Sequence, residues 1–408
     1  MSKSNETTPN VPTLRFAEFA EQWEQKTFDE TFLILSNNTL SRAELNYENG
    51  NYKNIHYGDV LIKFSTFIDV SSPDVPYIND ENSSSKLDNI LLQDGDIIIA
   101  DTAEDFTVGK ATEVENIDGI KVVSGLHTIP CRPKIKFSPR YIGYYVNSPA
   151  YHNQLIPFIQ GVKVSSISKT LIKKTFVSFP SLSEQTKIAD FLSCLDKKIE
   201  TQNKIISKYE TLIKGISNIL IHSFSLHSKV KLSDILLEYN KRTQINNEYP
   251  ILSSTMNGIF VQSDYFNKQA ASEDTIGYKK VPYGYCTYRS MSDTGVFKFN
   301  LQKVVDLGIV SPAYPVFTST VYDIDFVVFY MNNAISFKRQ ILEAKEGGTR
   351  FALSYSKLID LTIPNIPKIQ QKKIVDTYST FSKKMELEKA ILSKLKEQKN
   401  YLLSKMFI

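Results

Sequence analysis

The sequence predicts an α+β fold in which two globular units of duplicated origin are joined by two long antiparallel helices, paired as a coiled coil about a pseudo-two-fold axis. A heptad pattern predicts the helices, because apolar residues recur in alternating steps of four and three through residues 183–223, a stretch without proline. A repeat predicts the duplication, because the second half of the chain matches the first at an offset of about 186 residues. Short apolar runs between turn residues predict β-structure ahead of each helix.

The chain therefore alternates globular unit, helix, globular unit, helix. The expected segments are 1–180 for the first unit, 181–225 for the central helix, 226–364 for the second unit and 365–408 for the distal helix. Strands are predicted at 59–63, 96–100, 121–123, 283–288 and 307–310. Each unit is predicted to close with a helix, over 139–159 in the first and 325–344 in the second.

The central helix is predicted to begin after Pro180, where Ser181 and Glu184 match the S-x-x-E capping box. Some 40 helical residues make a rod of roughly 60 Å, which needs a partner along its apolar face. The distal helix is that partner in our interpretation, and the alternative is that each helix packs on its own globular unit. The residues predicted to pack between the helices are Ile188, Leu195, Gln202, Tyr209, Ile374, Phe381, Glu388 and Leu395.

The repeat extends beyond the apolar pattern of the helices. Polar Gln202 matches polar Glu388, which suggests that the two fix the register of the coiled coil. The other matching pairs are Gly109 with Gly295, Tyr144 with Tyr330, Asn147 with Asn333, Gly161 with Gly347, Ile167 with Leu353, and Gln185 with Gln371.

Composition excludes several classes of protein. Apolar residues make up 42% and charged residues 23% of the 408, as in an ordinary globular protein of two or more domains. No apolar run approaches the roughly 20 residues of a membrane helix, and the polar first ten residues do not resemble a secretory signal, so we expect a cytoplasmic protein. Three scattered cysteines form no disulfide or metal pattern. A net charge of +4 permits nucleic acid as a partner without requiring it.

No catalytic motif is complete. Residues 311–314 (S-P-A-Y) fall one residue short of the tetrad of amino-methyltransferases, and no glycine-rich cofactor loop accompanies them. Residues 105–110 end in Gly109-Lys110, but Glu104 stands where a phosphate-binding P-loop needs glycine. The five histidines never occur at metal-ligand spacing. The sequence therefore predicts a binding protein without catalytic or metal-binding residues.

Several loops combine lysine or arginine with glycine and hydroxyl residues, which suits contacts with phosphates and base edges. One such loop lies at the same place in each repeat, in residues 161–169 and 345–350. Each loop by itself is better explained as an ordinary solvated turn, and the occurrence of such a loop at the same place in both repeats shifts the balance toward binding. The predicted DNA-binding residues are Lys110, Thr112, Gly161, Lys163, Ser165, Ser166, Lys169, Lys279, Lys280, Arg289, Gly348, Thr349 and Arg350.

Taken in order, several stretches resemble the specificity (S) subunit of type I restriction–modification enzymes. They are L-R-F…W-E-Q-K at 14–26, G-D-I-I-I-A-D-T-A-E-D at 95–105, P-S-L-S-E-Q-T-K-I at 180–188 and a looser copy, P-K-I-Q-Q-K-K-I, at 367–374. The likeness covers nearly the whole chain, and the order of the stretches together with the duplication makes it specific.

This resemblance implies that each globular unit is a target recognition domain for one half of a bipartite DNA sequence. The helices would be spacers that set the gap between the half-sites and bind two methyltransferase (modification) subunits. Those subunits would bind S-adenosylmethionine, and restriction/translocase subunits would use ATP and Mg²⁺, so that this chain itself binds no cofactor and is not an enzyme.

Three other interpretations stay open at this point. The chain could be a self-contained DNA methyltransferase or nuclease, which binding of S-adenosylmethionine by the chain alone would reveal. It could be a coiled-coil assembly scaffold without DNA specificity. It could also be a partner or decoy that binds DNA without a cognate enzyme.

Overall fold

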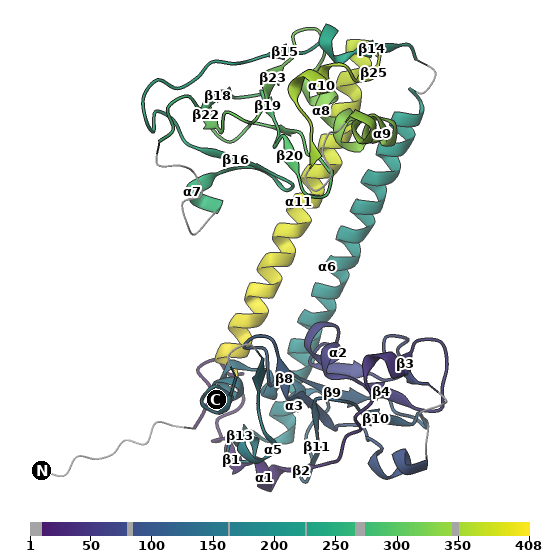
Figure 1. Cartoon of the computed structure of the whole chain (residues 1–408). Coiled ribbons are helices and arrows are strands. Elements are labelled where there is room, and N and C mark those ends of the chain that lie inside the picture. The colour runs from purple at the N-terminus through teal and green to yellow at the C-terminus, as the bar shows by residue number, and fades with distance from the viewer. Residues whose placement is uncertain (1–9, 80–84, 162–163, 225–226, 266–273, 345–350) are drawn as a thin grey trace, which may run out of the picture. The chain divides into compact units, whose positions relative to one another are not determined.

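A computed structural model of the chain describes residues 10–79, 85–161, 164–224, 227–265, 274–344 and 351–408 (Figure 1). The chain divides into two compact units. Unit 1 contains residues 1–202 and 391–408, and unit 2 contains residues 203–390. Each unit therefore takes one half of each long helix, whereas the division predicted from the sequence treats the helices as segments of their own.

Unit 1 is built on a five-stranded and a four-stranded sheet. The larger sheet has the order β2 (Phe32–Ile34), β11 (Thr128–Pro133), β7 (Ile97–Ala100), β9 (Ala111–Glu115) and β5 (Phe67–Asp69). The smaller has the order β10 (Val122–Ser124), β4 (Lys53–Ile55), β6 (Tyr77–Ile78) and β3 (Leu45–Asn46). Two further antiparallel pairs join β1 (Glu24–Thr27) to β13 (Phe176–Phe179) and β8 (Thr102–Ala103) to β12 (Ser165–Ser166).

Short helices cover these sheets. They are α1 (Phe28–Thr31), α2 (Tyr57–Ile62), α3 (Tyr141–Val146), α4 (Pro149–Leu155) and α5 (Lys169–Ile172). Helix α3 is attached to the sheet by Glu113 of β9, whose carboxylate accepts hydrogen bonds from the backbone N–H of Arg140 (2.6 Å) and Gly143 (2.9 Å). The carboxylate therefore satisfies donors at the beginning of the helix, which have no partner inside it.

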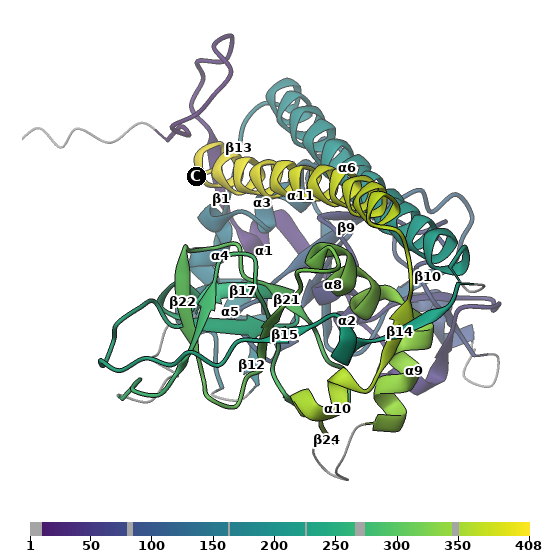
Figure 2. The ribbon, with the colours of Figure 1, turned by 90° about the horizontal axis from the view of Figure 1, so that it is seen from above.

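Unit 2 repeats this plan with smaller sheets. A four-stranded sheet has the order β15 (Leu237–Glu238), β23 (Val316–Thr318), β19 (Cys286–Thr287) and β21 (Asn300–Leu301). The antiparallel pairs are β14 (Lys229–Lys231) with β25 (Thr362–Pro364), β16 (Leu252–Thr255) with β17 (Gly258–Val261), β18 (Lys279–Pro282) with β22 (Leu307–Val310), and β20 (Met291–Ser292) with β24 (Phe351–Ala352). The helices are α7 (Gln262–Tyr265), α8 (Ile324–Asn333), α9 (Ile335–Ala344) and α10 (Tyr355–Ile359), which lies beside α9 (Figure 2).

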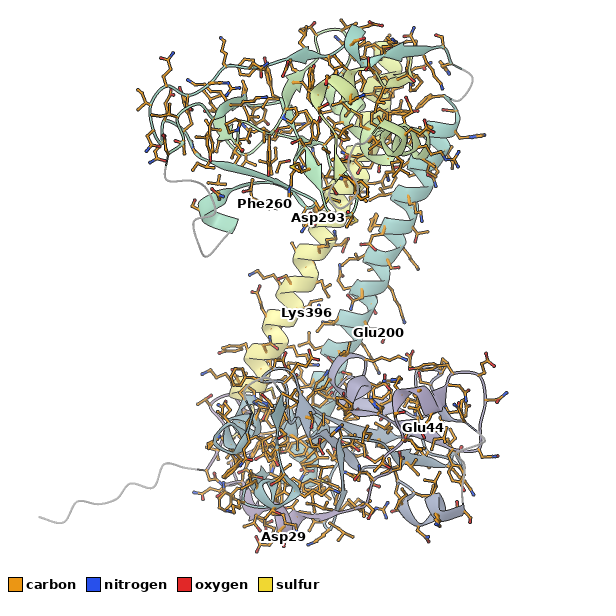
Figure 3. All side chains as sticks on the ribbon, viewed as in Figure 1. Asp29, Glu44, Glu200, Phe260, Asp293 and Lys396 are labelled. Atoms are coloured by element: carbon orange, nitrogen blue, oxygen red, sulfur yellow. The ribbon has the colours of Figure 1, made fainter. Side chains whose placement is uncertain are left out.

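The two long helices are α6 (Leu182–His222) and α11 (Lys368–Lys405). Their heptad positions are shielded from solvent: Ile188, Leu195, Gln202 and Ile374 are buried, and Tyr209, Phe381, Glu388 and Leu395 are partly buried. Many positions between the heptad residues are exposed, including Glu200 on α6 and Lys396 on α11 (Figure 3), whereas others such as Ser193 are buried.

Inside each unit, halves of both helices join the hydrophobic core. In unit 1, Leu192 and Leu195 of α6 share a core with Leu402 and Leu403 of α11. In unit 2, the end of α6 and the beginning of α11 contribute Leu220 and Ile374 to one core. Within unit 1 the two segments run antiparallel, because early residues of α6 lie with late residues of α11. The predicted α+β class, with two units joined by long helices, is confirmed.

Hydrogen bonds support the duplication. Gln185 Nε2 donates to Pro180 O (2.9 Å), and its Oε1 accepts from Ser138 N (2.9 Å). In unit 2, Gln371 donates to Ile366 O (2.7 Å) and accepts from Asp323 N (2.8 Å). The matching glutamines therefore fasten the beginning of each long helix to its unit in the same way.

Three local predictions were wrong. Residues 59–62 belong to helix α2 and Lys63 lies just beyond its end, so this stretch is not a strand; His56 Nδ1 accepts a hydrogen bond from Gly58 N at the beginning of the helix. The closing helix of each unit is two helices: Pro149 begins α4, and extended Ala334 separates α8 from α9. Glu184 does not cap α6. Its two carboxylate oxygens instead accept hydrogen bonds from Nε and Nη2 of Arg15, each at 2.7 Å.

None of the helices in the described part of the chain combines the length and apolar character needed to cross a lipid bilayer.

Candidate nucleic-acid interface

A polar cluster of unit 1 gathers where β8 pairs with β12. Thr102 lies opposite Ser166, and Ala103 lies opposite Ser165. The hydroxyl of Thr102 donates to Asp101 Oδ1 (2.8 Å), just beyond the end of the buried strand β7. The strand pair therefore brings two predicted residues, Ser165 and Ser166, next to a carboxylate and a hydroxyl from a distant part of the chain.

His127 belongs to the same cluster and lies in the turn before β11. Its φ is +55°, in the left-handed region that non-glycine residues rarely adopt. Nδ1 lies 3.3 Å from Asp101 Oδ1 and 3.4 Å from Thr102 Oγ1. The rings of His127 and Tyr57 pack edge to face, with their centroids 5.2 Å apart. The imidazole is exposed, yet contacts on two sides hold it in place.

Lys169 completes the cluster at the first turn of α5. Its amine donates to Asn37 Oδ1 (3.1 Å), and Asn37 Nδ2 donates to Gly125 O (3.1 Å). Ser168 caps the helix, because its hydroxyl accepts from Leu171 N. Lysine, amide and hydroxyl groups thus lie together on one exposed part of unit 1, which we call the unit 1 cluster: Asn37, Tyr57, Asp101, Thr102, His127, Ser165, Ser166 and Lys169.

Next to this cluster, His56 is buried and serves the fold. Its Nδ1 accepts from Gly58 N, and burial together with the guanidinium of Arg42 lowers the pKa of the imidazole. Arg42 itself forms an ion pair with Asp59 at 2.8 Å.

Unit 2 has a corresponding set of elements. Strand β20 pairs with β24, and Ser354 caps α10 as Ser168 caps α5. Ser290, just ahead of β20, donates from its hydroxyl to Ala313 O (2.9 Å) in the turn before β23. Arg289 is exposed and has no hydrogen bond or ion pair with any residue that the structure describes. Its guanidinium is therefore available to a ligand.

The S-P-A-Y stretch at 311–314 is part of this turn. Its residues connect β22 to β23, and Tyr314 N bonds to Ser311 O. Among the described residues, no three His, Cys, Asp or Glu side chains come together where they could hold a metal ion.

Two predicted residues lie away from the unit 1 cluster. Thr112 is completely buried in β9, which corrects its place in the predicted set, because a side chain inside the unit cannot reach a nucleic acid. Lys110 points inward and donates to Leu61 O (2.8 Å), and burial lowers the pKa of its amine. Both residues follow a basic-and-hydroxyl pattern, but Lys110 directly precedes β9 and Thr112 lies within it, and β9 is an inner strand of the five-stranded sheet.

The lysine pair of β18 is engaged within unit 2. Lys279 is only 8% exposed, and burial lowers the pKa of its amine. Lys280 forms an ion pair with Glu248 at 2.8 Å, which raises its pKa, and its amine lies over the ring of Tyr249. Neither amine is as exposed as the amine of Lys169 or the guanidinium of Arg289.

Gly161 has a φ of +105°, and a Cβ there would lie 1.9 Å from Val164 O, so only glycine fits this turn. Lys163, Gly348, Thr349 and Arg350 lie outside the described residues.

Sequence reasoning missed five members of the unit 1 cluster: Asn37, Tyr57, Asp101, Thr102 and His127. Asp101 and Thr102 stand in the G-D-I-I-I-A-D-T stretch, directly after four buried residues, and the polar residues that end a buried strand are a usable signal. His127 gave no such signal, since the residues around it only suggest a turn.

Comparison with known proteins gives a consistent result. Residues 20–211 match the family model described as the type I restriction modification DNA specificity domain. A chain of Methanocaldococcus jannaschii described as a type I restriction enzyme MjaX specificity subunit is 24% identical over 232 residues, which are 55% of this chain and 52% of that one. The alignment thus spans about half the length of that relative.

Solved structures share the fold. The type I restriction–modification S subunit from M. genitalium has a TM-score of 0.57 at 13% identity, covering 98% of this chain and 99% of that one. A chain from a study of complex assembly and conformational transition of the type I R-M system has a TM-score of 0.54 at 13% identity, covering 93% and 96%. At this identity the likeness concerns the fold alone.

Proposed function

The chain belongs to the family of specificity subunits of type I restriction–modification enzymes, and from this membership we propose that it binds double-stranded DNA at a bipartite target. Each unit contacts one half of the target. The chain itself carries out no catalysis. We expect it to work in the cytoplasm, where it has access to DNA.

The observation that carries this proposal is the recurrence of one arrangement in both units. A short strand pair, a preceding turn and a serine-capped helix lie together in each. Unit 1 offers Lys169 and His127 there, and unit 2 offers Arg289. Cationic groups bind phosphates and guanine, while amide and imidazole groups can form hydrogen bonds with base edges.

We propose that the outer faces of α6 and α11 bind two methyltransferase subunits, and that restriction/translocase subunits join through that complex. Supporting this, large apolar side chains on these helices are exposed outside the heptad positions, as on surfaces that bind other proteins. They include Phe191, Leu212, Ile219, Ile369, Leu387 and Ile391. S-adenosylmethionine, ATP and Mg²⁺ are then bound by the partners.

The test uses the full chain together with its methyltransferase subunits. Sequencing of methylated adenines in a host that carries the complex is expected to give one bipartite motif, and gel shifts should show that duplexes with this motif bind more tightly than random DNA. Affinity is expected to fall steeply with salt, because phosphate contacts release counterions. Absence of any preference among sequences would favour an assembly scaffold, and binding of S-adenosylmethionine by the chain alone would favour a self-contained enzyme.

A further inference from the structure

We infer that His127 is a base-reading residue of unit 1, and that it accepts a hydrogen bond from the exocyclic amino group of an adenine or a cytosine. This inference rests on the proposed function and adds to it the chemical class of base that one named atom recognises.

The backbone around His127 is held firmly. The carbonyl of His127 accepts a hydrogen bond from Asp101 N (3.1 Å), and Thr128 Oγ1 donates to Gly125 O (2.5 Å) and lies 2.6 Å from Ser124 Oγ. These bonds fix the turn on both sides of a residue with a φ of +55°. Unfavourable backbone conformations persist where surrounding structure imposes them, and they gather at functional sites. The turn therefore presents the imidazole in one orientation.

The hydrogen-bond network assigns the tautomer of His127. The hydroxyl proton of Thr102 is donated to Asp101, so the Thr102 oxygen that faces Nδ1 is an acceptor. Asp101 Oδ1, 3.3 Å from Nδ1, is an acceptor as well. Because both neighbours of Nδ1 accept, the proton of the neutral ring belongs on Nδ1. Nε2 then carries a lone pair, and within the described part of the chain no residue donates to it.

An acceptor at Nε2 selects its ligand. In the major groove, adenine offers the N6 amino group and cytosine the N4 amino group, whereas guanine and thymine offer carbonyl acceptors at the corresponding places. Phosphate oxygens are acceptors too, so the neutral ring does not bind the DNA backbone through Nε2. Lys169 is the residue of the unit 1 cluster that suits phosphate. Lys169 thus positions the DNA through its phosphates, and His127 recognises a base.

Two variants test the assignment in the complex of the full chain with its methyltransferase subunits. His127→Gly tolerates the left-handed backbone and removes the imidazole. Asp101→Asn keeps the shape but can donate to Nδ1, which would move the ring proton to Nε2. The matched control is Asn247→Gly, which changes another non-glycine residue with a φ of +55° in unit 2. Thermal unfolding of each variant checks that it folds.

The readout is competition binding with duplexes in which each base pair of the wild-type motif is changed in turn. For His127→Gly we expect discrimination to fall by roughly tenfold or more at one adenine or cytosine of one half-site, with the other half-site unchanged. For Asp101→Asn we expect preference at the same position to move toward guanine or thymine. Asn247→Gly should leave every position as in the wild type.

The possible outcomes distinguish a failure of the proposed function from a failure of the role assigned to His127. A wild-type complex without a bipartite motif contradicts the proposed function itself. A clear wild-type motif that stays unchanged at every position in His127→Gly overturns only the role of His127. Loss of discrimination at a guanine or thymine would show that Nε2 donates, which overturns the assigned acceptor. If His127→Gly does not fold, an unchanged preference in Asp101→Asn overturns the inference by itself.

Discussion

The amine of Lys399 lies 2.5 Å from Asp196 Oδ1, and this ion pair links α11 to α6 inside unit 1. The other carboxylate oxygen of Asp196 accepts from Tyr144 Oη at 2.6 Å. The two charged side chains are only 17% and 18% exposed. At the repeat offset of 186 residues, Lys399 aligns with apolar Ile213 and is therefore an exception to the match between the two helices. The structure explains the exception, because a charged residue there has a partner in unit 1.

Replacing Lys399 by alanine should destabilise unit 1 by about 1–3 kcal/mol, because the Asp196 carboxylate would keep its burial but lose its cation. The control is Lys396→Ala, which removes an exposed lysine from the same helix (Figure 3). Urea unfolding of the full chain measures both. Equal effects of the two variants would contradict a specific role for the ion pair.

Glu113 should make the stability of unit 1 depend on pH. Burial raises the pKa of this carboxyl from 4.5 to about 7. A carboxyl with a raised pKa in the folded state contributes stability that is complete below about pH 4.5 and is lost as pH rises toward 7. At about 1.4 kcal/mol for each pKa unit, the free energy of unfolding changes by on the order of 3 kcal/mol.

Glu113→Gln removes this titration, so the free energy of unfolding should vary less between pH 4.5 and 7 than in the wild type. The variant is expected to be less stable at every pH, because its amide NH₂ meets one of the backbone donors of Arg140 and Gly143. The comparison of slopes, measured by unfolding at several pH values, is therefore the test. Parallel curves would rule out Glu113 as the titrating group.

The matching glutamines should have matching effects. Gln185→Ala leaves Ser138 N and Pro180 O without their partners, and Gln371→Ala does the same to Asp323 N and Ile366 O. Each change is expected to cost about 1–3 kcal/mol in its own unit, since buried polar groups lose hydrogen bonds. Exposed Gln370→Ala serves as the control. Hydrogen exchange can assign each loss to a unit, and loss confined to neither would refute the duplicated role.

Lys169→Ala should weaken DNA binding uniformly across sequences and reduce the slope of log affinity against log salt by about one, as removal of a phosphate contact does. Lys174→Ala, an exposed lysine just beyond the other end of α5, should have a smaller effect. Salt titrations of binding by the complex measure both slopes. A change in preferred bases with an unchanged slope would mean that Lys169 reads bases.

Arg289→Ala should weaken recognition of the half-site that unit 2 contacts and leave the other half-site intact. An arginine contact to a base is worth about 1–3 kcal/mol. Arg339→Ala on α9 is the control, because it removes an exposed arginine of the same unit outside the arrangement around β20. Binding to duplexes altered in one half-site at a time distinguishes a local loss from a general one.

The sequence by itself determined the α+β class, the two long helices and the duplication. Those features depend on patterns that are local or repeated in the sequence. Examples are the heptad spacing, whose residues Ile188 and Ile374 are buried, and the matching glutamines at positions 185 and 371. Only the tertiary structure decided which candidate side chains are available. Lys110, Thr112 and Lys279 resemble Lys169 in local composition, yet they lie inward because of strands that pair far along the chain. Burial depends on those distant pairings, which likewise bring His127 to Asp101.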